Sequence, residues 1–259
     1  MPMTTITPIR KAPDQPDELT EWDMRVALAA CYRLIAHFSM DDLVYSHITA
    51  RVPGKDNQYL LNPYGLMYAE IKASNLVKVD DGGNPVEPTE FAVNRPGFVV
   101  IHGAVHRAWP DMNCVLHCHS HAATAVSALE EGLLPLTQGA MQFYHRVAYH
   151  DFHSMAFDDD DSARLVADLG DKQIMFMRNH GQLTVGRTVA EAFSFAYFLE
   201  EACRIQLEIM QSGGRMIQLS DAIAKGVAEQ YEKQVVPPEE REWPALLRML
   251  DRIDSSYRE

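Results

Sequence analysis

The chain has 259 residues, 47% of them apolar, which is enough for one large domain with a sizeable core. Its formal net charge is -13, and such an acidic balance argues against nucleic acid or an anionic membrane as a partner. The four cysteines include no CxxC pair and predict no disulfide framework. No signal-like or membrane-spanning apolar run is present, so we expect a cytoplasmic protein.

The first part of the chain predicts an arm, a helix and several short strands. Residues 1–19 are polar and rich in proline, so we expect a flexible arm. Thr20 and Asp23 have the spacing of a weak capping box, and apolar residues at helical spacing follow them. Between residues 45 and 79, short apolar runs alternate with Pro-Gly, Asn-Pro and Gly turns, which indicates strands and hairpins.

The second part of the chain alternates helices with strands. The acidic residues 158–161 suit the positive end of a helix dipole, and Thr188 with Glu191 forms a better capping box. Residues 235–244 indicate an exposed linker before a last short helix. Strands are expected at 114–119, 147–152 and 173–181, and helices at 97–109, 121–129, 158–170 and 188–210.

This alternation predicts one α/β domain. No internal repeat or dividing linker is present in the body of the chain. We therefore expect a single domain over residues 20–259, with a C-terminal extension from about residue 211.

Two histidines lie two residues apart in one expected strand. Side chains at this spacing share a face, so His117 and His119 can contact one metal ion while Cys118 faces away. His180, at a strand end next to a turn, is the candidate for a third ligand. Three ligands with an open position are typical of a catalytic metal site, and imidazole suits zinc or iron better than magnesium. An H-x-H pair alone is a weak signal, and two histidines with their hydrogen bonds satisfied near a surface are its more common explanation.

Four segments follow one another in the order and spacing of a known family: RAWPDMNCVLHCHSHAATAVSAL, VAYHDF, MFMRNHGQLTVGRTVAEAF and FLEEACRIQ. Over roughly residues 23–210, the chain resembles the class II aldolase/adducin family. The resemblance implies a three-layer α/β/α fold with a central, largely antiparallel sheet covered by helices. It also implies a homotetramer with one divalent metal ion per subunit on His117, His119 and His180. Zinc is the first expectation, with manganese or iron as alternatives.

The chain differs from the sugar-phosphate aldolases of this family at the catalytic Glu and at the phosphate-binding segments. Phe98 replaces the Glu that binds their metal and transfers a proton, and phenylalanine can do neither. Ser46-His47 and Asn62-Pro63-Tyr64-Gly65 replace the Gly-Asn and Thr-Pro-Ser-Gly segments that cradle phosphate. These changes resemble the adducin-type branch, which includes non-catalytic cytoskeletal proteins, dihydroxyphthalate decarboxylases and an iron-dependent oxygenase of prenylated aromatic acids.

Further site residues are assigned from their places in these motifs. The candidates for acid–base chemistry are His47, Tyr144 and His145, and those for substrate contact are Asn62, Tyr64, Gly65 and His121. Tyr144 or His145 could come from a neighbouring subunit. We interpret His102 and His106, four residues apart on a helix, as a polar face and not as a metal pair.

We therefore expect a metal-dependent lyase. It would cleave a C–C bond, by decarboxylation or retro-aldol cleavage, in a small non-phosphorylated hydroxy, keto or aromatic carboxylic acid. A Lewis-acidic metal stabilises the enolate-like charge that such cleavage leaves. Two alternatives stay open. One is an Fe(II)-dependent oxygenase on the same histidines, although the usual iron triad contains a carboxylate. The other is a non-catalytic adducin-like oligomeric binding module.

Overall fold

The computed structural model describes residues 19–153, 159–233 and 236–259. The predicted arm over residues 1–19 lies outside the described residues, apart from the exposed Leu19. Asp158, expected at a helix start, also lies outside them. No helix in the described ranges is long and apolar enough to cross a membrane.

A mixed β-sheet forms the centre of the molecule. In the described part of the chain it has seven strands in the order β3-β2-β1-β4-β7-β6-β5. Neighbouring strands pair antiparallel, except β5 and β6, which are parallel. The strands are β1 (His47–Arg51), β2 (Gln58–Leu61), β3 (Val77–Asp80), β4 (Cys114–Cys118), β5 (Val147–His150), β6 (Ile174–Met177) and β7 (Gly181–Gly186). The predicted largely antiparallel sheet is confirmed, although β7 was not foreseen as a strand.

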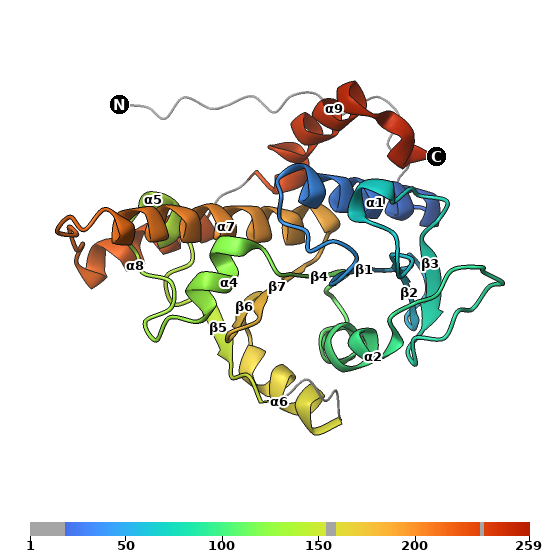
Figure 1. The fold of residues 1–259 in the computed structure, drawn as a ribbon, viewed down its shortest axis with the longest axis horizontal. Coiled ribbons are helices and arrows are strands. Elements are labelled where there is room, and N and C mark those ends of the chain that lie inside the picture. The colour runs from blue at the N-terminus through green and yellow to red at the C-terminus, as the bar shows by residue number, and fades with distance from the viewer. Residues whose placement is uncertain (1–18, 154–158, 234–235) are drawn as a thin grey trace.

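Helices cover both faces of this sheet, which confirms the three-layer α/β/α prediction (Figure 1). One layer contains α1 (Glu21–His37), α4 (His121–Ser127) and α7 (Val189–Gln211). The opposite layer contains α2 (Arg95–Gly97), the π-helical turn η2 (Phe98–Gly103), α3 (Ala104–Ala108) and α6 (Asp159–Leu169). Because strand side chains alternate, Leu116 and Cys118 of β4 pack toward the first layer and Val115 toward the second.

The two predicted capping boxes differ in the structure. At α1, the Thr20 hydroxyl accepts a hydrogen bond from Asp23 N at 3.1 Å, and Thr20 N donates to the Asp23 carboxylate at 3.0 Å. This is a complete box. At α7, Thr188 accepts from Glu191 N at 3.1 Å, but the Glu191 carboxylate accepts from Arg187 N at 2.6 Å. Both helices begin where the sequence indicates.

The predicted helix over residues 97–109 is wrong as a continuous α-helix. It is divided into α2, the π-helical turn η2 and α3, which together end at Ala108 before Pro110. Gly97 precedes the π turn, and Gly103 is its last residue. A π turn adds one residue to a helical turn and is common next to functional sites.

Residues beyond α7 pack back onto the body. Helix α8 (Asp221–Glu232), which the sequence analysis did not foresee, contacts α5 (Gln138–Met141). The linker predicted as exposed at 235–244 is only partly exposed where the structure describes it, with Pro237, Glu240 and Arg241 exposed. Thr188 and Ser194 of α7 donate to Glu239 and Glu242, and Trp243 at the start of α9 (Trp243–Ile253) is 8% exposed.

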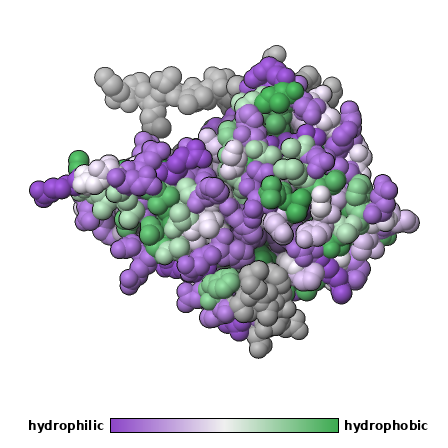
Figure 2. All heavy atoms as spheres, in the orientation of Figure 1, coloured by the Kyte–Doolittle hydropathy of each residue, from purple (hydrophilic) through white to green (hydrophobic). Residues whose placement is uncertain are grey.

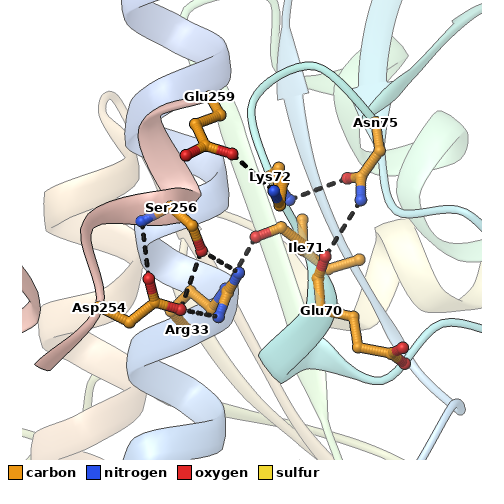
Figure 3. Close-up of polar contacts among 8 residues, drawn as sticks. All are labelled: Arg33, Glu70, Ile71, Lys72, Asn75, Asp254, Ser256 and Glu259. Atoms are coloured by element: carbon orange, nitrogen blue, oxygen red, sulfur yellow. Dashed lines mark hydrogen bonds and ion pairs between the residues drawn. The ribbon is translucent and has the colours of Figure 1, made fainter.

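The C-terminal turn η4 (Ser255–Arg258) makes polar contacts with α1 (Figure 3). Residues at this end of the chain also contact the loop after the short helix η1 (Tyr68–Glu70). Arg33 of α1 donates to the Ile71 carbonyl at 2.8 Å and to the Ser256 hydroxyl at 3.2 Å. Lys72 pairs with Glu259 at 2.6 Å. The extension from about residue 211 therefore contacts the same body, and its place in a single domain over residues 20–259 stays a prediction.

Candidate metal centre

Three histidine side chains converge beyond the end of β4. Nε2 of His119 lies 3.1 Å from Nε2 of His117 and 3.0 Å from Nε2 of His180. The three ligand atoms all lie within 4.8 Å of one another. Two imidazole nitrogens, each about 2.0–2.1 Å from one zinc ion, stand about 3 Å apart. The structure thus brings the three predicted ligands together at a spacing that fits a shared ion.

The second ring nitrogen of two ligands is already engaged. Nδ1 of His117 lies 2.9 Å from the carbonyl oxygen of Gln182, and Nδ1 of His119 lies 2.9 Å from Oδ2 of Asp42. A proton on each Nδ1 makes these bonds and leaves the Nε2 lone pair directed at the centre. Asp42 and Gln182 were missed in the sequence because each is near its ligand only in the folded chain.

Burial keeps two of the ligands uncharged. Burial and the neighbouring His119 lower the pKa of His180 to about 4. Burial, together with His180 and His119, holds the pKa of His117 well below its usual range. Both rings are therefore neutral at neutral pH, and only a neutral imidazole can ligate a metal.

The Asn179-His180-Gly181 turn presents His180 to the other two ligands. Asn179 has a φ of 56°, a left-handed conformation that asparagine tolerates better than most residues. A Cβ at Gly181 would stand 2.6 Å from the Cys118 carbonyl oxygen and 3.2 Å from Cδ2 of His119. Only glycine permits this approach of β7 to the end of β4.

Helix α4 begins directly after His119, and a buried carboxyl group holds its first turn. Glu200 of α7, 2% exposed, accepts from the Ser120 hydroxyl at 2.7 Å and from Ala122 N and Ala123 N at 3.0 and 2.8 Å. Gln182 also donates to the Ser120 hydroxyl, at 2.7 Å. Glu200 was not predicted as a site residue, although an acidic residue within a very apolar helix was a usable signal.

His47 lies on the sheet face that carries His117. The two residues are directly opposite each other in the β1–β4 ladder, so their side chains share a face. His47 is 5% exposed, and burial with the nearby His119 lowers its pKa to about 4. A Cβ at Gly97 would stand 2.9 Å from Cε1 of His47, so α2 packs closely on this ring. His47 is thus a neutral imidazole beside the triad.

The two histidines of the π turn and α3, which we interpreted as a polar helix face, are buried against β1. Nδ1 of His102 and Nε2 of His106 lie 3.0 and 2.9 Å from the Thr49 hydroxyl. His102 is 0% exposed, and its ring centroid is 5.5 Å from that of His47. Within the described residues, the possible metal group contains His117, His119 and His180 and neither of these rings.

Phe98 lies in an apolar cluster with residues of strands β2 and β3. It is fully buried, and its cluster includes Tyr59, Leu61 and Val79 of β2 and β3. The ring centroid of Tyr59 is 5.6 Å away. The side chain that replaces the aldolase Glu therefore contributes to packing.

The segments that replace the phosphate cradle have distinct structures. Ser46 has a φ of 72°, which explains a glycine in the related pattern, and its hydroxyl donates to the His117 carbonyl. Asn62 is buried and accepts from the Tyr32 hydroxyl at 2.9 Å. Tyr64 is 44% exposed, and Gly65 has a φ of 99°. Substrate contacts by Asn62, Tyr64 and Gly65 stay predictions.

Tyr144 and His145 lie at the opposite end of β5 from the triad. Strands β5 and β6 are parallel, and His150, at the far end of β5, pairs with Met177 just before the turn that holds His180. The Tyr144 hydroxyl donates to Asp221 of α8, and His145 Nε2 lies 3.8 Å from the same residue. Within one chain, neither residue adjoins the triad.

His121 is exposed and lines a surface pocket of about 590 Å³ together with Glu200 and Arg204. Its predicted role in substrate contact stays a prediction.

Comparison with known proteins places this geometry in a family. The model of the class II aldolase and adducin N-terminal domain matches residues 26–207. The chain belongs to the class II aldolase and adducin family. It is 43% identical to an aldolase II superfamily protein from Pseudomonas syringae, with a TM-score of 0.88 over 96% of this chain and 98% of that one.

Two other relatives show the breadth of this class II aldolase and adducin family. An L-fuculose 1-phosphate aldolase from Glaciozyma antarctica PI12 is 26% identical, with a TM-score of 0.82 over 95% of this chain and 97% of that one. Alpha-adducin from Rattus norvegicus is 38% identical over 89% of this chain, which spans 33% of that protein. The family comprises metal-dependent aldolases as well as adducins, and the histidine triad is suited to hold a divalent metal ion.

Proposed function

We propose that this protein is a metal-dependent carbon–carbon lyase that acts on a small non-phosphorylated hydroxy, keto or aromatic carboxylic acid. The main support is the triad of His117, His119 and His180, whose Nε2 atoms converge while Nδ1 of His117 and His119 is engaged elsewhere. A divalent ion, with zinc the first candidate, would supply Lewis-acid stabilisation of the charge that develops on a substrate oxygen when the bond breaks.

The residues around the triad favour cleavage of a carboxylic acid over that of a sugar phosphate. Phe98 is buried in an apolar cluster and offers no proton, and Ser46 uses its hydroxyl to bind the backbone of His117. The phosphate cradle is thus altered at both of its segments. We infer that a carboxylate and an adjacent oxygen of the substrate occupy the open side of the triad.

Proton transfer would involve His47 and residues of another chain. His47 is buried and neutral at neutral pH, so it would accept a proton or donate a hydrogen bond. The hydrogen bond to Asp221 raises the pKa of Tyr144, so this hydroxyl keeps its proton at neutral pH. Because Tyr144 and His145 do not adjoin the triad of their own chain, we infer that they serve a neighbouring subunit.

An oligomer, which we infer to be a homotetramer, is consistent with the surface near α8. Figure 1 shows that the end of α7 and α8 project beyond the sheet, and in Figure 2 this end is largely hydrophilic with some apolar atoms among the hydrophilic ones. The exposed apolar residues of this region include Ile205, Met210, Met216, Ile217, Leu219 and Ile223. A contact with another subunit would remove these exposed apolar side chains from water.

The decisive experiment is metal analysis of protein purified without added metal. We expect close to one zinc or manganese ion per chain, and we expect this metal to be lost in His117→Ala and in His180→Ala. His37→Ala, at the last turn of α1, is the matched control and should keep its metal. Circular dichroism of each variant shows whether the fold is retained.

Each other outcome points to a different function. Stoichiometric iron would favour the oxygenase alternative, since three neutral imidazoles also accept Fe(II). Protein that retains no metal, and binds none tightly after addition, would contradict the lyase proposal and favour a binding module. A metal-loaded protein justifies a screen of hydroxy acids and aromatic dicarboxylates for release of carbon dioxide or a carbonyl product.

A further inference from the structure

Phe152 is a half-exposed aromatic side chain beside the histidine triad. Its ring centroid lies 6.4 Å from that of His180, and the two ring planes meet at 84°. Phe152 is 47% exposed, whereas Phe98 and Phe176 are fully buried. A large apolar surface is thus open to solvent next to a ligand of the candidate metal centre.

The position of Phe152 follows from how β5 ends. The carbonyl oxygen of His150 accepts from Arg178 N at 2.8 Å, and the His150 ring lies 2.7 Å from the Asp168 carboxylate. These contacts fix the end of the strand next to the turn that carries His180. Residues 151–153 then leave the sheet with their side chains exposed. The packing of the sheet therefore brings Phe152 next to His180.

A second exposed apolar residue lies in the segment that contacts His119. Asp42, whose carboxylate binds Nδ1 of His119, is followed by Leu43, which is 61% exposed. Leu43 has a φ of 53°, a left-handed conformation that leucine rarely adopts, and an isolated bridge between Asp42 and Tyr45 closes this turn. Two segments that hold the ligands thus each present an apolar side chain to solvent.

We propose that Phe152 is a specificity-determining residue, and that the ligand of the metal centre carries an apolar, preferably aromatic, group next to its carboxylate. This inference rests on the proposed function and narrows its substrate class. Aromatic rings favour edge-to-face contact at centroid distances of about 4.5–7 Å. A phosphate or sugar hydroxyl placed against the phenyl ring would lose water without gaining a partner.

The test compares two α-hydroxy acids that differ by a phenyl group. Zinc-loaded protein is titrated with lactate and with phenyllactate in a calorimeter. We expect wild-type protein to bind phenyllactate on the order of fivefold more tightly than lactate. In Phe152→Ala this preference should disappear while the affinity for lactate is unchanged, and Phe152→Leu should retain part of it. Phe198→Ala, a variant at a 37% exposed phenylalanine of α7, should behave as wild type.

The outcomes separate this inference from the proposed function. Equal binding of the two acids by wild-type protein, or a preference that survives in Phe152→Ala, would overturn the role of Phe152 while lactate binding still supports the metal-site proposal. If neither acid binds zinc-loaded protein, the inference about Phe152 fails, whereas the proposed function is still decided by the metal analysis. A lower molar mass of Phe152→Ala in light scattering, with the preference intact, would assign the ring to a subunit contact and also overturn the inference.

Discussion

At the scale of single residues, the candidate metal centre depends on groups that orient the histidine ligands and on a backbone position without a side chain that leaves space for them. Asp42 and the Gln182 carbonyl each bind the Nδ1 of one ligand and thereby direct its Nε2 to the centre. Gly181 leaves the space that this arrangement needs, because a Cβ there would overlap the Cys118 carbonyl next to His119. A single methyl group added at Gly181 should therefore change the metal affinity.

We predict that Gly181→Ala weakens metal binding at least about tenfold and costs roughly 1–3 kcal/mol of unfolding free energy, because β7 must move away from β4. Competition with a chromophoric chelator measures the affinity, and urea unfolding measures the stability. Gly226→Ala, in α8 with open space around it, is the control and should be neutral or slightly stabilising. Equal metal affinity in Gly181→Ala and wild type would show that β4 and β7 can separate without moving His119.

At the scale of elements, α4 joins the two segments that carry ligands. Its first turn follows His119 and is held by Glu200 of α7. Past its other end, the Leu129 carbonyl accepts from Arg178, two residues before His180, at 2.5 Å. The Arg178 guanidinium also lies 4.3 Å from the Tyr149 ring centroid, which restricts its position. The distance between His119 and His180 therefore depends on how α4 is anchored.

We predict that Glu200→Gln lowers metal affinity about tenfold and destabilises the fold by roughly 1–3 kcal/mol. The amide nitrogen of glutamine cannot accept from the Ser120 hydroxyl or the α4 backbone, so a buried donor loses its partner. Glu201→Gln is the matched control, since the adjacent Glu201 is a half-buried residue paired with Arg204 at 3.2 Å. If the two variants bind metal equally well, α4 does not set the geometry of the triad.

At the scale of the whole molecule, several imidazoles are buried in the neutral form between the sheet and its second helical layer. Burial and His119 lower the pKa of His47 to about 4, and burial and Arg51 lower the pKa of His106 to about 3. In the unfolded chain, such histidines titrate near about 6.5. The unfolded state therefore binds protons at a higher pH than the folded state.

This difference predicts acid sensitivity of the metal-free protein. The stability that comes from neutral burial is fully present above about pH 6.5 and is lost progressively as the pH falls toward about 4. Urea unfolding of chelator-treated protein at about pH 7.5, 6 and 5 should give decreasing free energies. His106→Gln should show a shallower decrease than wild type. An unfolding free energy that does not change over this range would mean that these rings take up protons in the folded state as readily as in the unfolded state.

Local patterns determined much of this protein from the sequence alone. Helical spacing and the Thr20 and Thr188 caps located α1 and α7, because a cap depends on residues three positions apart. The two-residue period of a strand put His117 and His119 on one face, and Asn179-Gly181 indicated the turn that presents His180. The family pattern supplied the layered fold and also exposed the loss of the Glu at Phe98.

The tertiary structure determined the contacts between residues that are distant in sequence, which no local pattern predicts. Asp42, Gln182 and Glu200 reach the centre across 77, 65 and 78 residues from their partners, and only the sheet and helix packing brings them there. The same packing buries His102 and His106 against Thr49 and separates Tyr144 from the triad of its own chain. Periodicity fixes which way a side chain faces, but its partner is chosen by elements that are distant in sequence.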